Sequence, residues 1–163
     1  MNKTLVFDMD GTIADLYGVE GWLDDLAEES TRPYDVAEPL YKMDNLNVLI
    51  TLLKGIGWHI VVTSWVAKNA TKEYANAIRN SKIAWLDKMC FPYDEVHIVK
   101  YGATKADSTR KRGGIQILVD DNEKVRNGWH LGGTIDANKD IIKALADLMY
   151  EDLLYLDERN EVA

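Results

Sequence analysis

Short apolar runs alternate with longer amphipathic stretches along almost the whole of this 163-residue chain. The runs at residues 5–7, 59–63, 96–99 and 115–119 are mostly apolar at successive positions rather than at every second one. Strands that are apolar on both faces and separated by helices are typical of a parallel sheet covered on both sides. The pattern therefore predicts an α/β fold: a Rossmann-like three-layer sandwich with a mainly parallel sheet, in a single domain over residues 1–163.

Between these runs, the spacing of apolar residues predicts helices. Residues 46, 49, 50 and 53 mark one helical face, and Gly55 and Gly57 end that helix. A second helix is predicted for about 68–89, with Tyr74, Ala77, Ile78 and Trp85 facing inward. A last strand near 131–135 precedes a long amphipathic helix from about residue 138.

One segment departs from this alternation. Residues 16–43 are acidic and aromatic, and they carry Pro33 and Pro39. The segment follows the first predicted strand directly. Because ligands in open α/β sheets bind beyond the carboxyl ends of the strands, we expect it to form a small helical cap over a site.

Composition narrows the classes of function. Nineteen basic and 27 acidic residues give a net charge of −8, which disfavours general binding to nucleic acid or to an anionic membrane surface. The single cysteine, Cys90, excludes an internal disulfide and a cysteine-based zinc cluster. The first residues contain too short an apolar run for a signal peptide, and no run is long enough to span a membrane. We therefore expect a cytoplasmic protein.

Polar residues collect where the apolar runs stop. The carboxyl ends of parallel strands lie at one edge of a sheet, so the sequence predicts that these residues converge. They are Asp8 and Asp10 with Gly11, then Thr63 and Ser64, then Lys105, and finally Asp120 and Asp121.

The chemistry of this set points to phosphate and a hard cation. Four carboxylates that are brought together repel one another, and oxygen ligands without sulfur or histidine favour Mg²⁺. Thr63, Ser64 and Lys105 add donors that suit a phosphoryl group. An aspartate such as Asp8 is ionised at neutral pH and can act as a nucleophile without a base. Asp10 is placed to protonate a leaving alkoxide and then to deprotonate water.

The ordered motifs FDMDGT, VVTS, a lysine and LVDD resemble the haloacid dehalogenase superfamily of aspartyl phosphatases, over about residues 4–135. The resemblance implies that Asp8 is the nucleophile that forms an aspartyl-phosphate and that Asp10 is the general acid/base. It also implies that Thr63, Ser64 and Lys105 bind phosphate. Mg²⁺ would be held by the Asp8 carboxylate, the Asp10 carbonyl and at least one of the pair at 120–121.

Further details, DMDGTIAD, TSW, SKIAWLDKM and ILVDDN, look like the 5′(3′)-deoxyribonucleotidases of that superfamily. This resemblance implies hydrolysis of a nucleoside monophosphate to a nucleoside and phosphate. Trp22 in the cap and Trp65 after Ser64 are the candidates for contact with a substrate base.

Alternatives stay open at this point. Lys100 competes with Lys105 for the phosphate-binding role, and either member of the 120–121 pair can be the direct metal ligand. A basic cluster at 105 and 110–112 suggests a 3′-phosphatase of nucleic-acid ends, and a small cap also permits a phosphatase of another small metabolite. A non-catalytic phosphate-binding domain is a third alternative, but Asp10 has no use in mere phosphate storage.

Overall fold

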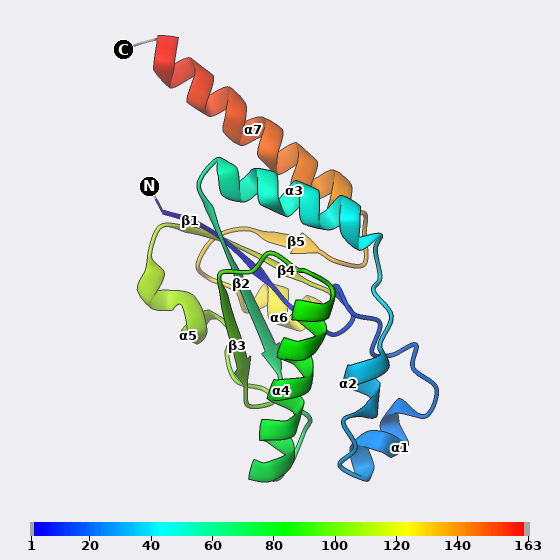
Figure 1. The fold of residues 1–163 in the computed structure, drawn as a ribbon. Helices are drawn as coiled ribbons and strands as arrows, with labels where there is room; N and C mark the ends of the chain where they lie inside the picture. Colours follow the sequence, from blue (N-terminus) through cyan, green and yellow to red (C-terminus); the bar gives the residue numbers. More distant parts are fainter. Residues whose placement is uncertain (1, 162–163) are drawn as a thin grey trace.

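A computed structural model describes the backbone of residues 2–161 and the side chains as far as residue 154. It contains a five-stranded sheet in the order β3-β2-β1-β4-β5, and every neighbouring pair is parallel (Figure 1). The strands are β1 (Lys3–Phe7), β2 (Trp58–Trp65), β3 (Glu95–Val99), β4 (Ile115–Asp120) and β5 (Thr134–Asp136). This arrangement confirms the predicted Rossmann-like α/β fold.

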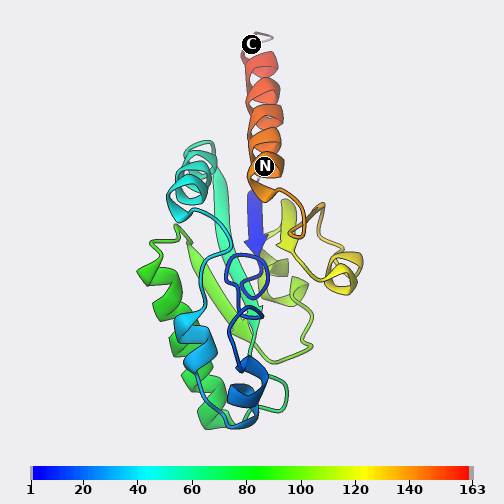
Figure 2. The same ribbon diagram turned by 90° about the vertical axis from the view of Figure 1, so that its right-hand side faces the viewer.

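Helices cover both faces of the sheet (Figure 2). On one face, α3 (Met43–Gly55), α4 (Lys72–Lys88) and the start of α7 (Ile141–Glu161) bury the main core with Phe7 and Val62. On the other face, α5 (Ala106–Thr109) and the segment after α6 (Glu123–Asn127) pack on Val6 and Leu118. The side chains of a strand alternate between the two faces, so each run had to be apolar throughout.

The strand order contains a switch point between β1 and β4. The chain builds outward from β1 through β2 to β3, and it then crosses to the opposite side of β1 to form β4 and β5. Phe7 pairs with Val119 in the register of β1 and β4, and the amide of Asp8 donates to the carbonyl of Val119 at 2.9 Å. In this topology the loops that leave the two strands diverge and leave a crevice above the sheet.

The predicted elements are found with shifted ends. Helix α4 begins at Lys72 rather than near residue 68, because Thr71 is its N-cap and accepts a hydrogen bond from the amide of Tyr74. Its inward face includes Ala75, whereas Ala77 is only half-buried. Strand β5 is shorter than predicted, and α7 starts after a turn at residues 137–139. In the described part of the chain, no helix has the length and apolar character needed to cross a membrane.

The segment at 16–43 contains two short helices, α1 (Trp22–Ala27) and α2 (Arg32–Val36). It packs along α4, where Tyr34, Tyr74 and Ile78 belong to one buried cluster. The Tyr74 hydroxyl donates to the Ser30 carbonyl at 2.8 Å, and the Trp85 indole donates to the Ala37 carbonyl at 2.7 Å. These contacts hold the segment against α4 at residues 30 and 37.

Candidate active site

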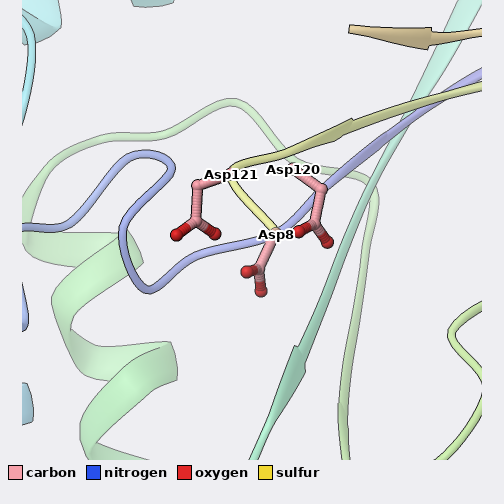
Figure 3. Close-up of side chains that lie close together, drawn as sticks. All are labelled: Asp8, Asp120 and Asp121. Atoms are coloured by element: carbon pink, nitrogen blue, oxygen red, sulfur yellow. The ribbon is translucent and has the colours of Figure 1, made fainter. Parts of the chain in front are cut away.

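Three carboxylates meet at the switch point. One oxygen from each of Asp8, Asp120 and Asp121 can be chosen so that all lie within 4.8 Å of one another. Asp8 follows β1 directly, whereas Asp120 ends β4 and Asp121 follows it. Figure 3 shows the three carboxylates pointing to the same side of the chain. This juxtaposition follows from the register, because Phe7 and Val119 are paired neighbours.

Lys105 lies among these acids. Its ammonium is 2.7 Å from Asp8 Oδ1 and 2.7 Å from Asp120 Oδ2, and its side chain is 2% exposed. Burial acts to lower the pKa of Lys105, but Asp8 and Asp120 outweigh burial and raise that pKa. Lys105 therefore stays charged. Lys100 is exposed at the end of β3, so the structure brings Lys105, and not Lys100, to Asp8.

One ammonium does not neutralise three carboxylates. Burial, followed by repulsion from Asp8 and Asp120, raises the pKa of Asp121 to about 6. Burial and repulsion from Asp8 also raise the pKa of Asp120, although Lys105 opposes them. A divalent cation would remove this repulsion, and the all-oxygen donor set fits a hard ion such as Mg²⁺.

Asp10 is set apart from this cluster and faces a second lysine. Lys82 Nζ lies 2.5 Å from Asp10 Oδ2, and the Lys82 side chain is 0% exposed. Burial raises the pKa of Asp10 and the Lys82 charge opposes that rise. Lys82 was not among the residues predicted for the site. Its position on the apolar face of α4, four residues after Ile78 and three before Trp85, was the sequence signal that indicated a buried lysine.

The two polar residues at the end of β2 point to opposite faces of the sheet, as strand alternation requires. The Thr63 hydroxyl is hydrogen-bonded to Ser108 Oγ at 3.0 Å on the α5 side. The Ser64 hydroxyl accepts from Lys82 Nζ at 2.9 Å on the α4 side. Ser64 lines the cavity described below, whereas Thr63 does not.

A cavity of about 310 Å³ lies above the acidic cluster, and Lys105, Asp8 and Asp10 form part of its lining. Two aromatic pairs line it as well. The rings of Tyr17 and Trp22, from the 16–43 segment, are 5.2 Å apart, and those of Trp65 and Tyr101, from the end of β2 and just beyond β3, are also 5.2 Å apart. Both tryptophans that the sequence proposed as base contacts thus line the cavity.

Other polar residues near the motifs have local partners. Asp15 Oδ1 accepts from the Gly18 amide at 2.9 Å, and Asn122 caps α6. The basic cluster at 110–112 does not act as a unit, because Arg110 pairs with Asp107 and Arg112 pairs with Glu95. Trp85 is buried, as predicted, and so are Trp58 and Trp129.

The fold and the strand-end acids define a class of protein: a parallel α/β protein with a cluster of acidic side chains at its topological switch point. One solved structure with this fold is the D,D-heptose 1,7-bisphosphate phosphatase from B. bronchiseptica, crystallised with magnesium and phosphate. The two chains share 12% sequence identity with a TM-score of 0.56, over 91% of this chain and 99% of the phosphatase. The likeness is one of fold. No family model matches this chain, and a search of curated proteins finds no match.

Proposed function

We propose that this protein is a Mg²⁺-dependent phosphomonoesterase of the haloacid dehalogenase superfamily, acting on nucleoside monophosphates. The observation that carries the proposal is the convergence of Asp8, Asp120, Asp121 and Lys105 at the floor of one cavity. The solved phosphatase of the same fold supports it, since that structure contains magnesium and phosphate.

Asp8 is the proposed nucleophile. Its carboxylate is 11% exposed, and it opens into the cavity beside a fixed ammonium. An Asp8 oxygen attacks phosphorus, and the bond between phosphorus and the ester oxygen breaks, which leaves an aspartyl-phosphate. Lys105 offsets the repulsion between the carboxylate and the phosphate dianion. Ser64, at the same cavity wall, has a hydroxyl hydrogen to donate to a phosphoryl oxygen.

Asp10 is the proposed general acid and base. Its carboxyl donates a proton to the departing alkoxide, and it later accepts a proton from the water that hydrolyses the aspartyl-phosphate. The raised pKa of Asp10, caused by burial, favours the protonated form that the first step needs. Asp10 lines the same cavity as Asp8, so both groups face one substrate.

The carboxylates of Asp8, Asp120 and Asp121, together with the Asp10 carbonyl, would hold the metal ion. When bound, Mg²⁺ would neutralise the acidic cluster and the phosphate charge. Thr63 has a different place in this scheme from the one that the superfamily resemblance implies. Because its hydroxyl is bonded to Ser108 of α5, we propose that Thr63 supports α5, and that Ser64 provides the hydroxyl contact with phosphate.

The aromatic lining supports a nucleotide as substrate. Four aromatic rings in the lining of one cavity suit a nucleobase better than a sugar, because stacking needs a π-face. The segment at 16–43 then acts as the cap that supplies Tyr17 and Trp22. Arg110 and Arg112 each pair with an acid, which reduces the local positive charge that favoured a nucleic-acid end.

The test is phosphate release, with Mg²⁺ and with EDTA, from a panel of phosphate esters. The panel contains ribo- and deoxyribonucleoside 5′- and 3′-monophosphates, sugar phosphates and a 3′-phosphorylated oligonucleotide. We expect Mg²⁺-dependent turnover that is fastest with a nucleoside monophosphate. Turnover of sugar phosphates alone would keep the roles of Asp8 and Asp10 and overturn the nucleotide assignment. No release from any ester would overturn the enzyme assignment.

A further inference from the structure

Lys82 is a fully buried lysine in the core, and among the described residues it is more deeply buried than Lys105. Lysine is almost never fully buried unless it is paired, yet Lys82 is 0% exposed in the middle of α4. The apolar face of the helix places it there, between Ile78 and Trp85. Burial of a charge costs free energy, and a fold tolerates this cost where an opposite charge lies nearby and the hydrogen bonds of the buried group are made.

The compensation is complete. An ammonium has three N–H donors, and those of Lys82 reach Asp10 Oδ2 at 2.5 Å, Ser64 Oγ at 2.9 Å and the Trp65 carbonyl at 2.8 Å. The ring of Tyr34, from α2, lies 5.0 Å from the same nitrogen. One cation therefore joins the loop after β1, the end of β2 and the segment at 16–43.

Its partners face the cavity, whereas Lys82 does not. Asp10, Ser64 and Trp65 all belong to the cavity lining, and Lys82 lies behind them. Because the ammonium can only donate, it occupies a lone pair of Ser64 Oγ and leaves the hydroxyl hydrogen to be donated elsewhere. Because it also binds Asp10 Oδ2, it fixes one oxygen of that carboxyl group and leaves the other for chemistry.

We propose that Lys82 is a positioning residue that fixes the Asp10 carboxyl for proton transfer and turns the Ser64 hydroxyl toward the phosphoryl group. The inference rests on the proposed function. In the step that it serves, a bond forms between Asp8 and phosphorus, and the bond between phosphorus and the ester oxygen breaks. The Asp10 proton passes to that ester oxygen, so the alcohol leaves neutral. A misplaced Asp10 would slow this transfer without preventing substrate from binding.

The leaving group separates this role from a merely structural one. An alkoxide needs a proton as it departs, whereas p-nitrophenolate is stable without one. The loss of a positioned acid therefore slows the cleavage of alkyl phosphates far more than that of aryl phosphates. A general loosening of the site slows both to the same degree.

The experiment compares Lys82→Met with the matched control Lys88→Met, which removes an exposed lysine from the same helix. Single-turnover rates of leaving-group release are measured with a nucleoside 5′-monophosphate and with p-nitrophenyl phosphate. For Lys82→Met we expect a loss of about 10²-fold with the nucleotide and of less than about 5-fold with the aryl ester. Lys88→Met should match the wild type on both. Equal losses on the two esters, or no loss, would overturn the inference.

A second variant guards against misfolding and tests the charge itself. Lys82→Ala is purified in propylammonium chloride. The added amine has the same number of carbon and nitrogen atoms as the part of the lysine side chain that the substitution removes. We expect the amine to restore nucleotide cleavage and n-propanol, which has the same length but no charge, to leave it unrestored. Equal rescue by both, or by neither, would contradict the inference. If the wild type releases no phosphate from either ester, the proposed function itself has failed. An active wild type with equal losses in the variant refutes only the role of Lys82.

Discussion

Two buried lysines approach the same cavity from opposite faces of the sheet. Lys105 comes from the α5 side and binds Asp8 and Asp120, whereas Lys82 comes from the α4 side and binds Asp10. Lys105 lines the cavity and Lys82 does not. In the proposed mechanism this difference separates two tasks: Lys105 neutralises phosphate charge in the cavity, and Lys82 holds the Asp10 carboxyl group in position from behind the cavity wall.

The first prediction removes the nucleophile on the Lys105 side. Asp8→Asn should lower kcat by about 10⁴-fold or more, because a neutral amide of similar shape is a poor nucleophile. The fold should survive, as judged by circular dichroism. Asp15→Asn, in the same loop and outside the acidic cluster, is the control and should stay active. Substantial turnover by Asp8→Asn would refute the aspartyl-phosphate scheme.

The second prediction tests the cation that faces the substrate. Lys105→Met should lower kcat/KM by about 10²- to 10³-fold, since a preorganised charge beside the transferring phosphoryl group is lost. In contrast to Lys82→Met, this loss should be similar for alkyl and aryl phosphates. Lys100→Met, on the exposed residue at the end of β3, should change little. A leaving-group dependence in Lys105→Met would erase the distinction between the two lysines.

The third prediction concerns the cavity wall contributed by the segment at 16–43. Trp22→Ala should raise KM for a nucleoside monophosphate by up to about tenfold, the value of one aromatic stacking contact, with little effect on kcat. KM for p-nitrophenyl phosphate serves as the internal reference. Val36→Ala, on an exposed residue of α2 outside the cavity, is the matched control. An unchanged KM would exclude Trp22 from substrate contact.

The smallest expected effect is on thermal stability. Folding raises the pKa of Asp121 to about 6. Above that pH the ionised carboxylate destabilises the folded, metal-free protein. This destabilisation disappears as the pH falls toward the ordinary carboxyl pKa, because the carboxyl group is then protonated. A metal ion removes the repulsion and needs the ionised form. Mg²⁺ should therefore raise Tm by more at about pH 7.5 than at about pH 5. The same rise at both pH values would contradict the metal assignment of this cluster.

The two lysines also show how far the sequence could be interpreted. Lys105 lies six residues beyond β3. The parallel arrangement of the strands predicted that a lysine after β3 lies near the acids, but it left Lys100 and Lys105 as alternatives, and the structure brings Lys105 to Asp8. Lys82 lies in the middle of a long helix, far along the chain from Asp10. Local spacing shows that its side chain points inward, but it does not show which buried carboxylate it meets.

Thr63 and Ser64 give a similar lesson about orientation. The sequence analysis assigned both hydroxyls to phosphate, although adjacent residues in a strand face opposite ways. Which of them faces the cavity depends on which helices cover which face, and the structure places Ser108 beside Thr63 and Lys82 beside Ser64.

By itself, the sequence determined the alternation of strands and helices, and with it the parallel sheet and the convergence of acidic strand ends. These features follow from local periodicity and from the geometry of parallel strands. Only the tertiary structure decided that Lys82 pairs with Asp10, that Thr63 is bonded to Ser108, and that two aromatic pairs line one cavity. Such contacts depend on how helices far apart in the chain pack on the sheet, and packing joins residues that no local pattern relates.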